Sequence, residues 1–167
     1  MIYSNYDALV EAFARREIDL AWNAPLAYVK TKRRLQGACQ VVAMRDVDIN
    51  FTTHFIANAD SVIAVVEDLK GKRVALGSRG SMQAGLLPYY FLQQLGSSPG
   101  YSHCCFTAHS DLDPVLTEKI TQAFVAIDSR DPAGKAVLEG EGCKAFVPGI
   151  TTGWETLEKA AEQAGIL

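Results

Sequence analysis

Short apolar runs alternate with amphipathic helical patterns along this chain, and that alternation limits the fold more than any other feature. Apolar residues at helical spacing predict a helix over residues 5–16, and a compact apolar run predicts a strand over residues 18–22. Pro25 fits the first turn of a second helix, whose end carries the basic side chains of residues 30–34. Strands that alternate with helices predict an α/β sheet with crossover helices.

The same alternation continues through the middle of the chain. A short helical turn closed by Gly71 and a longer helix over about residues 82–95 separate further apolar runs. These runs predict strands over residues 39–44, 51–57, 73–76 and about 103–107.

The last third of the chain is predicted to be mostly helical. Asp113 and Asp131 are each followed by proline and mark the starts of helices that end near residues 127 and 140. A Gly/Pro-rich bend at residues 146–149 leads to a final helix over about residues 154–164. Because this tail contains no predicted strand, we expect it to pack on the sheet that the earlier strands form.

Length and composition exclude several classes of protein. A chain of 167 residues forms one domain or two small lobes. With 49% hydrophobic and 21% charged residues, it fits a packed globular protein and not a disordered, collagen-like or coiled-coil one. The net charge of −3 gives no electrostatic reason to bind nucleic acid.

Membrane and disulfide signals are weak as well. No apolar run approaches the roughly 18–20 residues that a membrane-spanning helix needs, so we expect no direct membrane insertion. The first residues show neither a basic n-region nor an apolar h-region, so no signal peptide is visible. The four cysteines form no C-x-x-C pair, and we expect mostly buried, free thiols.

The turn at residues 77–81 is the most informative local feature. It links a predicted strand to a predicted helix, and Gly77 and Gly80 allow the backbone to turn tightly. A helix N-terminus offers free N–H groups and a partial positive charge, which both favour an anion. The Ser81 hydroxyl and the Arg79 guanidinium would add donors for a small oxyanion or carboxylate. A plain turn with Ser81 as the helix N-cap fits the same pattern.

Two further segments are candidates for the same ligand. Residues 23–25 form a second strand-to-helix junction, which would present another helix N-terminus. His109 follows the strand predicted at residues 103–107, at the strand end where open α/β sheets bind ligands. It is therefore either a ligand contact or an ordinary loop histidine.

Motifs for other chemistries are missing. The interval from Gly80 to Gly85 matches a P-loop, but Leu86 stands where the P-loop has lysine, and neither G-x-G-x-x-G nor G-x-S-x-G occurs at this turn. The histidines and cysteines of residues 103–109 match no zinc spacing. No Ser/His/Asp or Cys/His arrangement is evident, so we expect no metal, no cofactor and no enzymatic activity.

Four segments, taken in order, resemble a known family. The first is YDALVEAF followed by EIDLAWNAP within residues 6–25, and the second is VEDLKGKRVA at residues 66–75. The third is GSMQAGLLP at residues 80–88, and the fourth contains KITQAF, GKAVL and FVP between residues 119 and 148. In this order they resemble the phosphate, phosphite and phosphonate-binding (PhnD-like) substrate-binding proteins of ABC transporters, which are type 2 periplasmic binding proteins.

The resemblance implies a three-layer α/β/α fold in which a ligand lies between two lobes and is passed to a membrane permease. The lobe-like parts would be residues 1–65 plus 113–167, and residues 66–112. It also implies a periplasmic or extracytoplasmic location, and a cleft faced by an aromatic, a serine turn and a histidine. With the turn described above, the candidate ligand-binding residues are Tyr6, Ser78, Arg79, Gly80, Ser81, Gln83 and His109.

The chain is shorter than the family pattern. The family's opening strand and helix would precede Tyr3, and several dozen further residues would lie between His109 and Asp113. Met82 and Gln83 stand where phosphonate binders carry hydroxyl side chains. Because a shortened chain leaves a sheet edge or lobe surface uncovered, we expect a homodimer. The alternative to a binding protein is a remnant or interaction domain of this fold without a working cleft.

Overall fold

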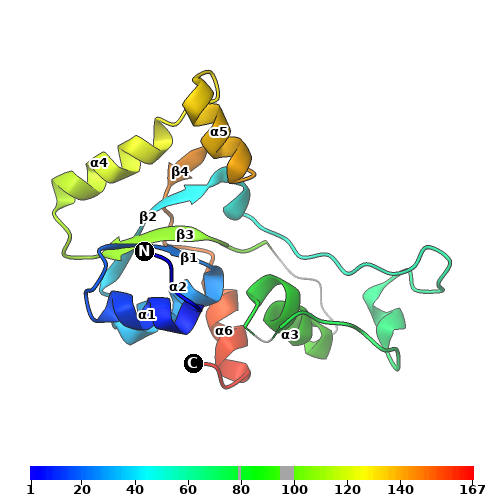
Figure 1. Cartoon of the computed structure of the whole chain (residues 1–167). Coiled ribbons are helices and arrows are strands. Elements are labelled where there is room, and N and C mark those ends of the chain that lie inside the picture. The colour runs from blue at the N-terminus through cyan, green and yellow to red at the C-terminus, as the bar shows by residue number, and fades with distance from the viewer. Residues whose placement is uncertain (79, 95–99) are drawn as a thin grey trace.

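A four-stranded sheet forms the centre of the molecule, and a long arm projects from the body around it (Figure 1). The computed structural model describes residues 1–78, 80–94 and 100–167. The strand order is β1-β3-β2-β4, and every neighbouring pair is antiparallel. The strands are β1 (Leu20–Asn23), β2 (Cys39–Arg45), β3 (Cys105–His109) and β4 (Phe146–Pro148).

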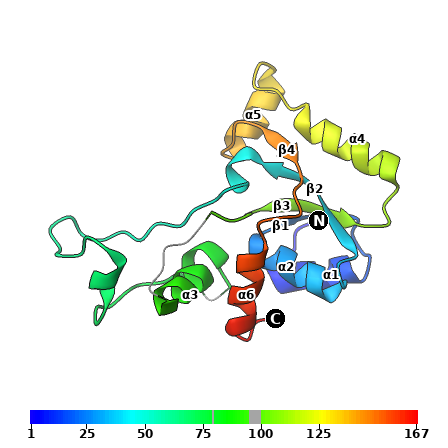
Figure 2. The same ribbon diagram turned by 180° about the vertical axis from the view of Figure 1, so that it is seen from behind.

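Helices cover both faces of this sheet (Figures 1 and 2). On one face lie α1 (Tyr6–Ala14), α2 (Pro25–Arg34) and α6 (Glu155–Gln163), and on the other lie α4 (Pro114–Val125) and α5 (Pro132–Gly140). Since β1 and β2 both pair antiparallel with β3, they run parallel to each other, and α2 crosses between them. The expected α/β fold with a crossover helix and three layers is therefore confirmed.

The hydrophobic core fills the space between the sheet and the layer of α2 and α6. Tyr28 and Val29 of α2 pack there with Met44 of β2 and with Trp154 and Leu157, all at most 3% exposed. The rings of Tyr28 and Trp154 lie 4.3 Å apart between centroids. This core fixes the start of α2, which borders the site described below.

Local sequence signals set the starts of the two helices on the other face. Asp113 caps α4 by accepting a hydrogen bond from the backbone N–H of Leu116 (2.8 Å). Asp131 caps α5 in the same way, by accepting from the backbone N–H of Gly134 (2.8 Å). In both cases proline follows the cap, as the sequence predicts.

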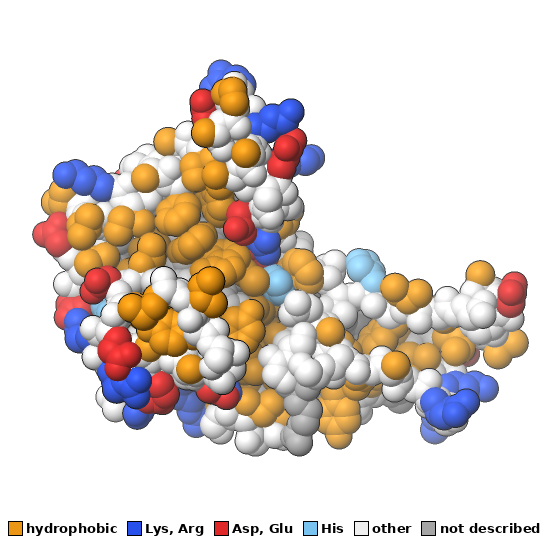
Figure 3. All heavy atoms as spheres, viewed as in Figure 1, with side chains coloured by type: hydrophobic (Ala, Val, Ile, Leu, Met, Phe, Trp, Pro, Cys, Tyr) orange, Lys and Arg blue, Asp and Glu red, His pale blue; other side chains and the backbone are white. Residues whose placement is uncertain are grey.

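Residues 52–78 form the projecting arm, which leaves the body next to β2 (Figures 1 and 3). The arm returns to the body at the turn of residues 77–81 that contains Ser81, here called the serine turn. The 3-10 turn Val66–Leu69 is the arm's helical element and confirms the helical turn predicted before Gly71. Hydrophobic side chains lie on the arm's surface, with Ile56 96% and Val62 83% exposed. The arm thus leaves apolar surface in water that a folded lobe would normally bury.

The strands predicted at residues 51–57 and 73–76 are wrong. Phe51 makes one isolated bridge to Tyr101, and the described chain places no neighbouring strand beside either segment. A strand is stable only when a neighbour completes its backbone hydrogen bonds. Both segments have the residue pattern of strands, but the described structure contains no sheet for them to join.

The strand predicted at residues 103–107 is shifted by two residues. The backbone N–H groups of Ser102 and His103 donate to loop carbonyls, those of Gly153 (3.1 Å) and Asp48 (2.8 Å), so sheet pairing begins only at Cys105. His109 consequently becomes the last residue of β3 and does not follow it.

The expectation that the tail contains no strand is also wrong. Residues Phe146–Pro148 pair with β2 as the edge strand β4, within the segment predicted as a bend. A three-residue strand is too short to show an alternating pattern, which explains why the sequence did not reveal it.

The division into two lobe-like parts stays a prediction. Here β3, which falls in the second of those parts, is a central strand between β1 and β2 of the first part.

All four cysteines carry free thiols, with Cys105 buried and the others partly exposed. None of the helices in the described ranges is long and apolar enough to cross a bilayer.

Candidate functional site

The starts of three helical segments meet at one pocket of about 370 Å³, here called the three-helix pocket. Two of the segments are α1 and α2. The third begins as a short π-helix (Met82–Leu86) and continues as α3 (Leu87–Gln94). The lining residues are Asn5, Tyr6, Asp7, Ala24, Pro25, Leu26, Ala27, Lys30, Ser78, Gly80, Ser81, Met82, Gln83, His103 and Cys104.

The first turns of α1 and α2 leave backbone donors at this pocket. Asn5 caps α1 by accepting from the backbone N–H of Ala8 (2.9 Å), while α2 begins with Pro25 and has no side-chain cap. N–H groups in the first turn of a helix have no acceptor within the helix and carry its partial positive charge. Ala24 and Pro25 of the second strand-to-helix junction thus line the same pocket as the serine turn, as the sequence suggested.

The serine turn supplies the third helix start. The Ser81 hydroxyl accepts a hydrogen bond from the backbone N–H of Ala84 (3.3 Å) and so caps the helical segment. The backbone N–H of Gly77 donates to the carbonyl of Ala84 (2.6 Å), which ties the end of the arm to the same segment. Thr53 of the arm donates to the Gln83 carbonyl (3.1 Å), so the turn is held from both sides.

The two charged side chains among the described lining residues, Asp7 and Lys30, are paired. Lys30 of α2 lies 2.7 Å from the carboxylate of Asp7 at the start of α1. Among the lining residues that the structure describes, this pair leaves no net side-chain charge, and the helix starts add positive potential.

Arg45 and Asp48 form a buried ion pair that contacts His103, one of the residues lining the pocket. The Asp48 carboxylate is fully buried and is bound by Arg45 through Nε (2.6 Å) and Nη2 (3.0 Å). The same carboxylate lies 2.7 Å from Nδ1 of His103, whose ring stacks on Phe51 with centroids 4.1 Å apart. Burial alone would raise the pKa of the Asp48 carboxyl, but hydrogen bonds from His103 and Arg45 outweigh it and hold that pKa below its ordinary value.

The cluster of Asp48, His103 and Cys104 brings three metal-type donor atoms within 4.8 Å of one another, a grouping that the sequence did not suggest. Both Asp48 oxygens are already bound by Arg45 or His103, and a guanidinium repels a cation. Burial raises the pKa of the Cys104 thiol to about 12, so it is protonated at neutral pH and is a poor ligand. These residues fit a hydrogen-bonded ion pair better than a metal centre.

Five of the candidate ligand-binding residues come together at the three-helix pocket: Tyr6, Ser78, Gly80, Ser81 and Gln83. Arg79 lies outside the described residues. These five come from segments more than 70 residues apart in sequence, so the fold creates a grouping that spacing alone did not guarantee.

His109 is not part of this pocket. Its ring stacks on Phe13 of α1, with centroids 4.0 Å apart and planes 4° from parallel, and the residue is 4% exposed. The cause is the shift of β3, which places His109 inside the sheet beneath α1. The histidine that does line the pocket is His103, and sequence reasoning considered it only as a possible metal ligand.

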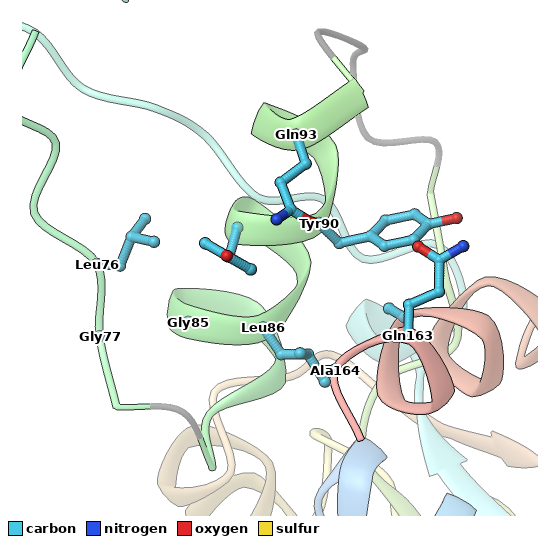
Figure 4. A pocket seen from close by; sticks show the side chains of 10 residues that line it. Leu76, Gly77, Gly85, Leu86, Tyr90, Gln93, Gln163 and Ala164 are labelled. Atoms are coloured by element: carbon cyan, nitrogen blue, oxygen red, sulfur yellow. The ribbon is translucent and has the colours of Figure 1, made fainter. Parts of the chain in front are cut away.

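A second hollow, of about 530 Å³, lies between α3 and α6 (Figure 4). Tyr90 and Gln93 of α3 face Gln163 of α6 across it, and Leu76 and Gly77 border it from the arm (Figure 4). No charged side chain lines it within the described ranges, so the three-helix pocket is the better anion site.

A family of transport proteins matches more than half of the chain. The sequence model described as "ABC transporter, phosphonate, periplasmic substrate-binding protein" matches residues 1–100. The chain belongs to this family. The matched range contains the first turns of α1 and α2 and the serine turn.

A curated relative agrees with that assignment. The probable ABC transporter phosphite binding protein PhnD1 of Prochlorococcus marinus (strain MIT 9301) is 32% identical over 98 residues, which are 55% of this chain and 33% of the relative. The matched part thus spans about a third of the relative's length. Nothing in the comparisons favours the alternative of a remnant without a working cleft.

Solved structures share the fold at low identity. PhnD1 of P. marinus in complex with methylphosphonate matches with a TM-score of 0.80 and 17% identity, covering 100% of this chain and 86% of that one. A binding protein component of an ABC phosphonate transporter, PA3383 of Pseudomonas aeruginosa, matches with a TM-score of 0.63 and 14% identity, covering 90% and 69%. XAC2383 of Xanthomonas citri, bound to chloride, matches with a TM-score of 0.60 and 15% identity, covering 99% and 84%.

Proposed function

We propose that this chain binds a small tetrahedral oxyanion of the phosphonate class in the three-helix pocket, as the substrate-binding component of an ABC transporter. The observation that carries the proposal is the convergence of three helix starts on one pocket. Free N–H groups and partial positive charge at several helix starts match an anion with oxygens pointing in several directions.

The candidate residues have distinct roles in this proposal. Backbone N–H groups next to Gly80 and Ser81 would bind ligand oxygens, and the Ser78 and Ser81 hydroxyls would add donors. Tyr6 at the start of α1 is 53% exposed and would cover the ligand from the opposite side. Gln83 would contribute its amide, and Arg79 a guanidinium that suits phosphonate oxygens.

One relative, PhnD1 of Prochlorococcus marinus, supports this ligand class through both its curated name and its solved structure. The curated relative is named a phosphite binding protein, and the P. marinus structure holds methylphosphonate. We therefore propose phosphite, phosphate or a small phosphonate as ligand, an ABC permease as partner and the periplasm as location. Because the family binds and delivers solutes, we propose no enzymatic activity for this chain.

Isothermal titration calorimetry tests the ligand assignment. We expect the folded chain to bind at least one of phosphate, phosphite and methylphosphonate, and Ser81→Ala to weaken that binding about tenfold through loss of a donor. Ser129→Ala, in the exposed loop between α4 and α5, is the matched control and should bind normally. If the folded protein binds none of the three at millimolar concentration, the proposal is wrong.

We also propose that two copies of the chain associate. The proposal rests on the apolar surface of the arm and on α4, none of whose residues is buried. Pairing with a second copy would cover such surface. Light scattering at micromolar concentration should give the mass of a dimer, and a compact monomer would refute the idea.

A further inference from the structure

We propose that Pro88 and Thr53 are positioning residues of the three-helix pocket, and that its affinity for a ligand depends on the arm being docked through the Thr53 hydroxyl. The inference rests on the proposed function and adds to it two residues that act on the ligand site without lining it. Three features support it: the wide first turn of the helical segment, the place of the proline in that segment and the contacts that the arm makes with it.

The helical segment that follows Ser81 starts wider than an α-helix. The Ser81 carbonyl accepts from the backbone N–H of Leu86 (3.0 Å) as well as from that of Gly85 (3.0 Å). The Met82 carbonyl accepts from the backbone N–H of Leu87. Bonds that span five residues define a π-helix, a turn that is rare inside α-helices and frequent at functional sites.

Pro88 explains why the carbonyls of this first turn need donors from elsewhere. Proline has no backbone N–H. In the α-helical register residue 88 would donate to the Ala84 carbonyl, and in the π-helical register to the Gln83 carbonyl. Pro88 can do neither, so both carbonyls lack a donor that any other residue at this position would offer.

The arm supplies a donor to each of these two carbonyls. The Thr53 hydroxyl donates to the Gln83 carbonyl (3.1 Å), and the backbone N–H of Gly77 donates to the Ala84 carbonyl (2.6 Å). Thr53 lies near the start of the arm and Gly77 near its end, where Figure 4 shows the chain beside the helical segment. Both ends of the arm are thus docked on acceptors that the proline leaves.

Tyr101 fixes the direction of the Thr53 hydroxyl. Its phenol oxygen lies 3.3 Å from Thr53 Oγ1, and the residue is 2% exposed. Burial raises the pKa of the Tyr101 phenol, so the phenol keeps its proton at neutral pH. Because Thr53 gives its one hydroxyl proton to the Gln83 carbonyl, Tyr101 donates to Thr53. A chain of hydrogen bonds therefore runs from a buried ring to the start of the helical segment.

The docked start of this segment is also a wall of the three-helix pocket. Ser81, Met82 and Gln83 line the pocket. When the arm leaves the Gln83 carbonyl, the first turn is free to shift, and only the fraction of molecules with the turn in place binds a ligand tightly. Because such coupling is reciprocal, a bound anion also favours the docked arm.

Calorimetry with methylphosphonate tests the role of the hydroxyl. Thr53→Val keeps the shape of the side chain but removes the donor, and we expect it to weaken binding about tenfold. Thr53→Ser keeps the hydroxyl and should bind within about twofold of the unaltered protein. Thr52→Val is the matched control, because the exposed Thr52 hydroxyl contacts His54 of the arm (3.4 Å), and it should leave the affinity unchanged.

A donor restored at position 88 tests the role of the proline. Pro88→Ala supplies a backbone N–H for the freed carbonyls, so the Thr53 hydroxyl should matter less. We expect Thr53→Val to weaken binding less than about twofold in the Pro88→Ala background, whereas a general loss of stability would be the same in both backgrounds. If Pro88→Ala itself binds no methylphosphonate, the comparison of Thr53→Val with Thr53→Ser decides.

Hydrogen exchange on the unaltered protein measures the reciprocal effect. Saturating methylphosphonate should slow exchange of the Gly77 N–H at least about fivefold, because the ligand favours the docked arm. The N–H of Val65, which donates to the Asp68 carboxylate within the arm (3.1 Å), is the internal control and should exchange at the same rate with and without ligand.

Each outcome has a separate meaning. Methylphosphonate binding that Thr53→Val leaves unchanged, or a loss that Pro88→Ala does not reduce, overturns this inference and leaves the proposed function standing. Equal exchange of the Gly77 N–H with and without ligand does the same. Absence of binding by the unaltered protein to phosphate, phosphite and methylphosphonate overturns both.

Discussion

At the scale of single residues, the serine turn depends on one glycine whose position allows no side chain. A Cβ atom at Gly85 would lie 2.1 Å from the Ser78 carbonyl oxygen and 2.9 Å from its carbon. The backbone of residues 77 and 78 crosses over the short π-helix Met82–Leu86 at Gly85. The wall of the three-helix pocket is therefore placed by a backbone contact that tolerates only glycine.

Gly85→Ala should displace that wall. We expect a loss of about 1–3 kcal/mol in the free energy of unfolding, because backbone must shift to remove the overlap. Affinity for the ligand of the unaltered protein should fall about tenfold, because Ser78 moves with the backbone. Urea unfolding and calorimetry measure the two effects. Gly140→Ala, at the end of α5 with no atom within 4 Å of the new Cβ, is the control. Equal stability of the two variants would contradict the prediction.

The Asp48 carboxylate links stability to acid pH. Its pKa is lower in the folded chain than in the unfolded one, despite burial, because His103 and Arg45 bind the charged form. The stabilisation is therefore complete above the unfolded-state pKa and is lost as the pH falls below about 4 through the folded-state value.

Asp48→Asn should make the acid loss of stability shallower. At neutral pH it should also lower the free energy of unfolding by about 3–5 kcal/mol, since Arg45 loses its buried partner. Urea unfolding at a series of pH values separates the two effects. Asp60→Asn, on the exposed arm, serves as the control. The same acid slope in Asp48→Asn and the unaltered protein would refute the assignment.

At the scale of elements, α4 attaches to the sheet through few contacts. Phe124 packs on Phe106 of β3 (centroids 4.3 Å apart) and on Phe146 of β4 (5.3 Å), and the Thr121 hydroxyl donates to the Val42 carbonyl (3.0 Å). No residue of α4 is buried. One half-buried aromatic ring therefore carries much of the attachment.

Phe124→Ala should loosen α4 from the sheet. The expected loss is about 1–3 kcal/mol, less than for a fully buried phenylalanine because this residue is partly exposed. Val125→Ala, at a 39% exposed neighbour in the same helix, should cost under about 0.5 kcal/mol. Chemical denaturation compares them, and similar losses from both would show that the Phe124 ring does not anchor the helix.

Sequence patterns located the helices of this fold better than its strands. The caps at Asp113 and Asp131 act within four residues, so the sequence alone places α4 and α5. The apolar runs at residues 51–57 and 73–76 look like strands but have no neighbour in the described sheet. Helix hydrogen bonds are local, whereas a strand depends on partners far away in sequence.

The same distinction explains which site residues the sequence revealed. The serine turn is a local strand-to-helix pattern, and its residues do line the pocket. His103 depends on Asp48, 55 residues away, and no spacing rule links the two. The sequence predicts His109 just after a strand that ends at residue 107. Because β3 is shifted by two residues, His109 instead lies within the strand, as its last residue.

At the scale of the whole molecule, the two halves of the chain interleave in one sheet. Strands β1 and β2 come before the arm, and β3 and β4 come after it, yet the order across the sheet is β1-β3-β2-β4. Ion pairs between Lys32 and Glu158 (2.6 Å) and between Arg33 and Glu162 (2.8 Å) also join the halves. Each half therefore completes its sheet hydrogen bonds only with the other.

Trypsin should cut first in the arm, at the exposed Lys70, Lys72 or Arg73, because an unpaired extended segment fits a protease most easily. We expect the two fragments to co-elute in size-exclusion chromatography and to separate only in denaturant, because cutting the arm breaks no sheet contact. A variant with all three residues changed to glutamine should resist this first cut. If the nicked fragments came apart in native buffer, the arm would have to be the link that holds the halves together, in conflict with the interleaved sheet.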